Sequence, residues 1–97
     1  MTPPVIDLSG KAAFVTGGGG GIGRAAALSL AAAGADVAVI DVIPERCAEV
    51  VAAVEAMGRQ AFGIPGNVME TSVVTDAVEA AAARFGRLDV LVNNAGG

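Results

Sequence analysis

The chain has 97 residues, which suffice for one small domain at most, or for a part of a larger one. Its residues are 54% apolar but only 3% aromatic, so we expect a core built from Ala, Val, Leu and Ile. The formal net charge of -4 and six scattered cations argue against a nucleic-acid binder, because nothing supplies a basic stripe.

The first part of the chain has the pattern of a strand, a helix and a second strand. An irregular lead-in over residues 1–10 is followed by an apolar run over residues 12–16, which predicts the first strand. The alanine-rich run over residues 21–33 predicts a helix, and Gly34 supplies its stop. A second strand is expected over residues 37–41.

The rest of the chain continues this alternation. Pro44 suits the first turn of a second helix, which we expect to end near Gly58. A third strand is predicted over residues 60–64, a third helix over residues 70–85 and a fourth strand over residues 88–92. Alternating strands and helices are typical of a parallel sheet with crossover helices.

The handedness of such crossovers predicts the topology. Right-handed crossovers place the first two helices on one face of the sheet. In a doubly wound sheet the fourth strand returns to the other side of the first, and the third helix lies on the opposite face. We therefore predict an α/β fold, a Rossmann-type doubly wound parallel sheet with strand order 3-2-1-4 and three crossover helices, truncated after strand four.

The turn between the first strand and the first helix is the most informative segment, residues 16–23 (TGGGGGIG). Glycines permit positive φ angles and let a ligand approach the backbone closely. The helix that follows offers free N–H groups and the positive end of its dipole to an anion. The segment therefore fits the pyrophosphate of a dinucleotide, although a glycine run alone is also compatible with a plain turn.

Asp41 ends the second predicted strand. Counted from the glycine-rich segment, its position is near the spacing of about 20 residues at which a carboxylate binds ribose in dinucleotide-binding folds. A carboxylate accepts hydrogen bonds from both ribose hydroxyls and repels a 2′-phosphate. No cation is expected to offset it, because the loop has no Lys or Arg before Gly21 and Val42 follows Asp41. The sequence thus predicts NAD over NADP, the alternative being that Asp41 only caps a turn.

A further motif, residues 88–96 (LDVLVNNAG), spans the fourth predicted strand and the turn after it. Together with Thr-Gly-x-x-x-Gly-Ile-Gly at residues 16–23 and the acid at the end of the second strand, it resembles the short-chain dehydrogenases/reductases. Residues 8–11 (LSGK) also resemble the usual opening of that family. The likeness covers nearly the whole chain, in register and in order.

The resemblance implies a role for several residues on the phosphate and ribose side of a cofactor site. Gly17, Gly21 and Gly23 are expected to shape the phosphate turn. Ile22 is expected to offer its backbone N–H to the pyrophosphate. Asp41 is expected to hold the adenosine ribose.

The resemblance also implies residues around the adenine and near the fourth strand. Asn67 and Val68 are expected to flank the adenine; many relatives have Asp where Asn67 stands, but either oxygen can accept a hydrogen bond from the adenine amino group. Asn94, Ala95 and Gly96 are expected to line the cofactor.

The family's catalytic residues, by contrast, are missing from the chain. The resemblance implies a Tyr acid/base, a Lys that lowers its pKa and a Ser that orients the carbonyl, all beyond the fourth strand. The chain has no tyrosine, its lysine is Lys11, and its serines lie at positions 9, 29 and 72. We therefore expect residues 1–97 to be the N-terminal part of one dinucleotide-binding domain, with no catalytic residue and no activity of its own.

The predicted function is that of an NAD-dependent oxidoreductase, whose full-length form transfers a hydride between nicotinamide and a secondary alcohol or ketone. The resemblance also implies that this full-length form is a homo-oligomer acting on a small molecule. Two alternatives remain at this stage. One is a non-catalytic nucleotide-binding module, and the other is a different doubly wound group, such as a methyltransferase or an epimerase-type dehydrogenase.

No targeting, membrane or metal-binding signal stands out in the sequence. The start, MTPP, lacks a positively charged region followed by an apolar one. The most apolar stretch, residues 25–40, is interrupted by Gly34 and Asp36, so we expect no membrane span and a cytoplasmic protein. There is no histidine, and Cys47 is expected to pack as a small apolar residue, so no metal site is predicted.

Overall fold

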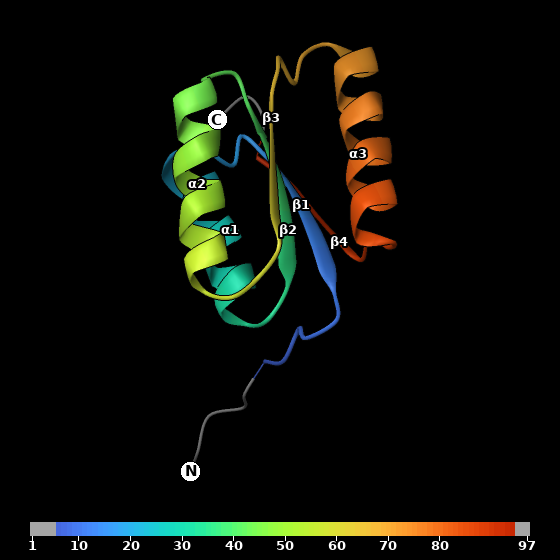
Figure 1. Ribbon diagram of the computed structural model, residues 1–97. Coiled ribbons are helices and arrows are strands. Elements are labelled where there is room, and N and C mark those ends of the chain that lie inside the picture. Colours follow the sequence, from blue (N-terminus) through green and yellow to red (C-terminus); the bar gives the residue numbers. More distant parts are fainter. Residues whose placement is uncertain (1–5, 95–97) are drawn as a thin grey trace.

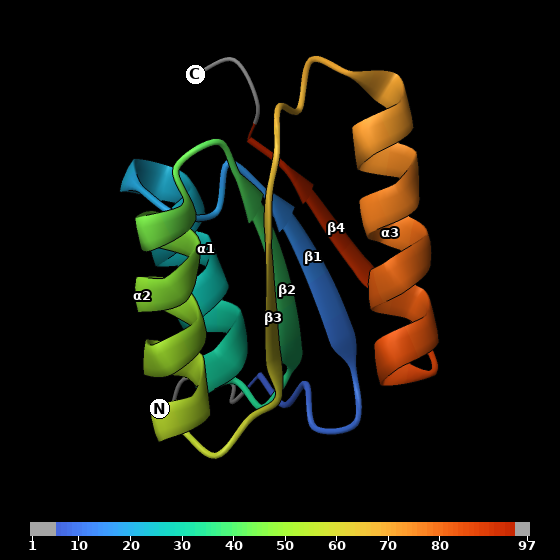
Figure 2. The same cartoon turned by 45° about the horizontal axis from the view of Figure 1, so that its top comes forward.

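The computed structural model describes residues 6–94, which form a four-stranded sheet between two layers of helices (Figure 1). The strands are β1 (Ala12–Thr16), β2 (Asp36–Asp41), β3 (Ala61–Pro65) and β4 (Val90–Asn93). The helices are α1 (Gly21–Ala32), α2 (Pro44–Ala56) and α3 (Thr71–Phe85). Helices α1 and α2 cover one face of the sheet and α3 covers the other, as the two views in Figures 1 and 2 show.

All strand pairs are parallel, and the order is β3-β2-β1-β4. The doubly wound topology predicted from crossover handedness is thereby confirmed, as is the placement of the third helix opposite the other two. Strand β1 has the predicted bounds, and the bounds of the other elements differ from the predicted ones by one or two residues. The parallel arrangement brings the carboxyl ends of β1, β2 and β4 to the same edge of the sheet.

The start of β4 is the clearest of these differences, since the strand begins at Val90 rather than at residue 88. The Asp89 carboxylate accepts a hydrogen bond of 2.9 Å from the backbone N–H of Ala12 and two from the Arg87 guanidinium. The bond to Ala12 ties the segment just before β4 to the start of β1. Residue 89 therefore lies next to Ala12, and the β1–β4 register continues with Ala13 opposite Val90.

Strand β1 is buried along its whole length because helices cover both of its faces. Successive side chains alternate between the faces. Val15 packs with Val39 of β2 on the side of α1 and α2. Phe14 packs with Ile40 of β2 on the side of α3. Two separate apolar cores therefore fix the sheet between the helix layers.

Small residues form the buried faces of α1 and α3, in keeping with a core that has few aromatic residues. Ala27 and Ala31 of α1 and Ala77 and Ala81 of α3 are buried against the sheet. Their short side chains let the helix backbones lie close to the strands. Across residues 6–94, no helix has the length and apolar character needed to span a bilayer.

Candidate functional site

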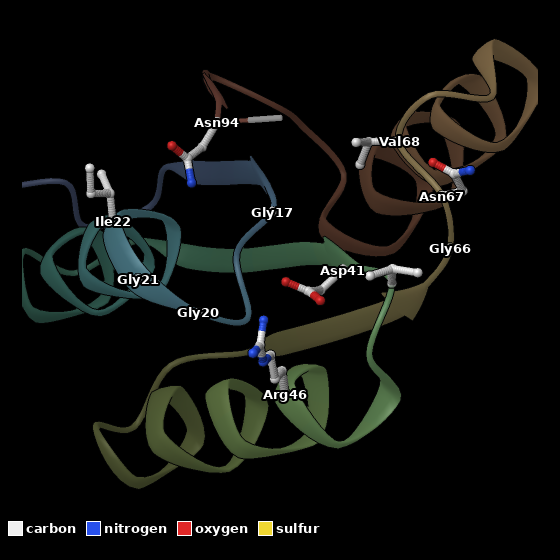
Figure 3. Close-up of a pocket in the computed structure, with 11 residues that line it drawn as sticks. Gly17, Gly20, Gly21, Ile22, Asp41, Arg46, Gly66, Asn67, Val68 and Asn94 are labelled. Atoms are coloured by element: carbon white, nitrogen blue, oxygen red, sulfur yellow. The ribbon is translucent and has the colours of Figure 1, made fainter. Parts of the chain in front are cut away.

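A pocket of about 510 Å³ opens at the carboxyl edge of the sheet (Figure 3). Four segments line it: the turn between β1 and α1, the end of β2 with the start of α2, the loop between β3 and α3, and the end of β4. The lining residues are Gly17, Gly20, Gly21, Ile22, Asp41, Val42, Arg46, Gly66, Asn67, Val68 and Asn94. Such a volume lies within the range of about 300–1,000 Å³ found for cofactor and small-molecule sites.

Most of the residues singled out from the sequence meet in this pocket. Those that line it are Gly17, Gly21, Ile22, Asp41, Asn67, Val68 and Asn94. Gly23 lies just behind it, in the first turn of α1. Ala95 and Gly96 lie outside the described residues. The structure thus groups residues from both ends of the chain, and their contact with a cofactor stays a prediction.

The glycine turn has the geometry of an anion site. Gly17 and Gly21 have φ angles of 62° and 55°, a region that side chains strongly disfavour. A methyl group on Gly23 would collide with the carbonyl oxygen of Gly17, so the turn and the helix can approach this closely only with glycine there. Helix α1 begins without a side-chain cap, which leaves its first N–H groups available to an acceptor in the pocket.

Asp41 is only 6% exposed, and both of its carboxylate oxygens accept backbone hydrogen bonds. Oδ2 accepts from the N–H of Gly19 at 3.1 Å, and Oδ1 accepts from the N–H of Ile43 at 2.9 Å. The side chain therefore does hold a turn, as the alternative interpretation of the sequence had it, and it also lines the pocket. Each oxygen keeps a further lone pair, so accepting a ligand's hydroxyl remains chemically open to it.

Thr16 ties the end of β4 to the glycine turn. Its hydroxyl oxygen accepts a hydrogen bond of 2.8 Å from the backbone N–H of Asn94 and lies 3.1 Å from Oδ1 of Asn93. Thr16 and Asn93 are also partners in the strand register. These bonds place Asn94 beside Gly17, on the pocket wall (Figure 3).

The loop between β3 and α3 supplies a separate wall of the pocket. Oδ1 of Asn67 accepts a hydrogen bond of 2.9 Å from the N–H of Met69, which closes a tight turn. Val68 is half-buried and also packs on the core beneath α3. Asn67 and Val68 lie together on the pocket side of this loop (Figure 3).

Comparison of the sequence with models of known protein families shows which family the chain belongs to. The sequence model of the family described as short chain dehydrogenase matches residues 11–97. The chain belongs to this family. The resemblance inferred from the two motifs is confirmed, and neither alternative, a non-catalytic module or another doubly wound group, is favoured.

Individual relatives are similar to this chain along almost its whole length. The 7alpha-hydroxysteroid dehydrogenase of Escherichia coli is 38% identical over 92 residues, which are 95% of this chain and 36% of that protein. A short chain dehydrogenase from Burkholderia cenocepacia J2315, solved with NADP, is 50% identical with a TM-score of 0.90, covering 93% of this chain and 37% of that one.

A third relative was solved with the other nicotinamide cofactor. Carveol dehydrogenase from Mycobacterium avium, in complex with NAD, is 33% identical with a TM-score of 0.88, covering 92% of this chain and 36% of that one. Solved relatives thus hold NAD or NADP, which supports a nicotinamide cofactor. The chain spans about a third of the length of the curated relatives it matches.

Arg46 is the pocket residue that sequence reasoning missed. The expectation that no cation stands near Asp41 is wrong, because Arg46 lies in the first turns of α2 and lines the same pocket (Figure 3). Neither the glycine loop before Gly21 nor the residue after Asp41 carries a cation, and the arginine comes from the next helix instead. The helical spacing of the sequence could have indicated this position. Arg46 precedes the buried Val50 by one helical turn and so lies at the border of the face that α2 packs inward.

Cys47, the next residue, is buried beside the pocket rather than in it. Its Sγ lies 3.8 Å from the carbonyl oxygen of Asp41 and 3.7 Å from that of Ile64. Burial raises the pKa of the Cys47 thiol, which favours its protonated form. Within the described part of the chain, no group of three or more His, Cys, Asp or Glu side chains is placed to hold a metal ion.

Proposed function

We propose that this short-chain dehydrogenase chain binds NAD, in preference to NADP, for an oxidoreductase that acts on a secondary alcohol or ketone. The observation that carries the proposal is that the Asp41 carboxylate and the uncapped amino end of α1 face one pocket. An anion-binding helix end and an acceptor for ribose hydroxyls are the two groups that the adenosine half of NAD requires.

The diphosphate of the cofactor belongs over the amino end of α1 in this proposal. The first helical turn carries no acidic side chain that would repel it. The backbone N–H groups of Gly21 and Ile22 provide donors there, while Gly17 and Gly23 keep the turn and the helix close enough together.

The remaining contacts follow from the other walls of the pocket. Asp41 accepts hydrogen bonds from the adenosine ribose, and its charge disfavours a 2′-phosphate. Asn67 and Val68 enclose the adenine. Asn94, followed by Ala95 and Gly96, lines the cofactor on the side of β4.

A bound nicotinamide supplies the site that gives or takes a hydride, and the chain's own residues supply binding and orientation. The chain has no tyrosine, and Lys11 lies just before β1, at the sheet edge opposite the pocket. Among the described residues that line the pocket, the titratable side chains are Asp41 and Arg46, and this proposal assigns Asp41 to the ribose rather than to the reacting alcohol. We therefore propose that turnover requires residues of a longer protein, as in the full-length relatives.

Replacing Asp41 tests the proposed cofactor preference. In ¹⁵N NMR titrations of the chain, NAD is expected to bind more tightly than NADP and to shift the amide signals of residues 17–23. Asp41→Ala is expected to narrow that preference by about tenfold, corresponding to about 1.4 kcal/mol. The ratio of the two dissociation constants is the readout, because a loosened glycine turn weakens both cofactors alike.

Asp76→Ala is the matched control, since Asp76 is an exposed acid on α3, away from the pocket. It removes the same charge and is expected to leave the ratio unchanged. An unaltered ratio in Asp41→Ala, or a titration with NAD that leaves the amides of residues 17–23 unmoved, would contradict the proposal.

A further inference from the structure

We infer that Arg46 binds the 2′-phosphate of NADP, so that Asp41 and Arg46 together give the pocket a graded rather than a strict preference for NAD. The inference rests on the proposed cofactor site and adds a second specificity-determining residue to it. It rests on three features of Arg46: its position across the glycine turn, its unpaired guanidinium and its closeness to Asp41.

Arg46 lies across the outer side of the glycine turn. A methyl group on Gly19 would come within 2.5 Å of Cβ of Arg46. A methyl group on Gly20 would come within 3.2 Å of a terminal guanidinium nitrogen. The absence of side chains at both positions therefore makes room for the arginine, whose charged end lies beside Gly20 at the pocket (Figure 3).

No interaction within residues 6–94 holds the guanidinium of Arg46 away from a ligand. Among residues 6–94 it has no hydrogen-bond or ion-pair partner, whereas the neighbouring Arg24 is paired with Glu49 at 3.1 Å. Its five N–H donors are consequently available, and their planar fork matches the oxygens of a phosphate.

Asp41 and Arg46 flank the same turn. The Asp41 carboxylate is bonded to the N–H of Gly19, and the Arg46 side chain covers Gly19 and Gly20. A ribose held by Asp41 would therefore lie beside the turn that Arg46 covers. Among the described residues that line the pocket, these two are the charged ones, so the guanidinium offsets the repulsion of the carboxylate for a phosphate.

The test is Arg46→Gln, titrated with NAD and with NADP by ¹⁵N NMR. We expect the dissociation constant of NADP to rise about tenfold, as for the loss of one charge-assisted hydrogen bond, and that of NAD to change by less than about twofold. Raising the salt concentration from about 0.05 to about 0.5 M is expected to weaken NADP binding more in the wild type than in Arg46→Gln.

Two further variants test whether the change in NADP affinity depends on the charge and on the position of Arg46. Arg46→Lys keeps the charge and is expected to retain part of the NADP affinity. Arg24→Gln removes an equal charge from the start of α1, outside the pocket lining, and is expected to leave the ratio of NADP to NAD affinity unchanged.

The outcomes separate this inference from the proposal on which it rests. Arg46→Gln is expected to widen the preference for NAD, whereas Asp41→Ala is expected to narrow it. Equal weakening of both cofactors by Arg46→Gln would show that the side chain only packs on the glycine turn and would overturn the inference, as would unchanged NADP binding. A failure of the Asp41→Ala result would instead overturn the proposed ribose contact.

Discussion

Two aspartates use their carboxylates to bind backbone N–H groups of other segments. Asp41 bridges the N–H groups of Gly19 and Ile43 at the pocket. Asp89 binds the N–H of Ala12 and pairs with Arg87 at the opposite edge of the sheet, where β1 and β4 begin. A residue that holds the backbone and also contacts a ligand links folding to binding. Asp41 can serve in both ways, while Asp89 lies away from the pocket.

Asp89 provides a prediction about pH. Hydrogen bonds from Arg87 and from the backbone of Ala12 lower its pKa to about 2. An unfolded chain has an ordinary Asp pKa of about 3.9, so the folded state binds this proton more weakly. The stabilisation from Asp89 is therefore complete above about pH 4 and is lost as the pH falls toward 2. Urea unfolding across this range is expected to lose less stability in Asp89→Asn than in the wild type.

Arg87→Gln provides the matched test for this cause of the low pKa. Without the guanidinium, the pKa of Asp89 is expected to rise toward its ordinary value, which a carboxyl ¹³C NMR titration measures directly. The explanation fails if Asp89 in the wild type titrates at the ordinary value, or if Arg87→Gln leaves its pKa unchanged.

At the level of secondary-structure elements, one close contact fixes how the glycine turn joins β1 to α1. Gly23 faces the carbonyl of Gly17, so the first turn of α1 lies directly against the turn that leaves β1. The amide of Asn94 also approaches Gly23, which brings the end of β4 to the same point. Three elements therefore converge where a single Cβ would not fit.

Gly23→Ala is predicted to destabilise the fold although alanine is the better helix former. Propensity alone favours alanine by about 1 kcal/mol, but the collision with Gly17 forces the turn apart, and overpacking of this kind costs about 1–3 kcal/mol. Thermal unfolding is expected to show a lower midpoint, and an NMR titration is expected to show weaker NAD binding.

Gly58→Ala is the comparison for this prediction, because Gly58 follows α2 away from the pocket and a methyl group there meets open space. Its φ of 81° predicts some loss of stability, but NAD binding is expected to be unchanged. A Gly23→Ala chain with the stability and NAD affinity of the wild type would contradict the close-contact argument.

The sequence predicts this arrangement well wherever local rules decide it. Crossover handedness and the glycine stops yield the strand order, and the carboxyl ends of parallel strands must share an edge, which collects Gly17, Asp41 and Asn94. Tertiary contacts decide the rest. The place of Arg46 depends on how α2 is rotated over the glycine turn, and the start of β4 depends on a bond between Asp89 and the distant Ala12.

Across the whole molecule, the strands of the sheet are buried to different extents. Every residue of β1 is buried, and so are all residues of β2 but the first. In β4, by contrast, Leu91 is 62% exposed although it lies opposite the buried Phe14 in the strand register. The buried side of α3 packs on Phe14 and Ile40. An apolar side chain thus remains accessible next to the outer edge of the described sheet.

Leu91→Thr is predicted to reduce self-association of the 97-residue chain in solution. Exposed apolar residues on an unpaired strand edge promote pairing between copies, and threonine removes apolar area while keeping a good strand propensity. Sedimentation velocity over a range of concentrations provides the measurement, with a smaller concentration dependence expected for Leu91→Thr. Met69→Thr is the control, because Met69 is 77% exposed but lies in the loop before α3 rather than on a strand. Identical behaviour of wild type and Leu91→Thr, or an equal effect of Met69→Thr, would show that the edge of β4 does not drive association.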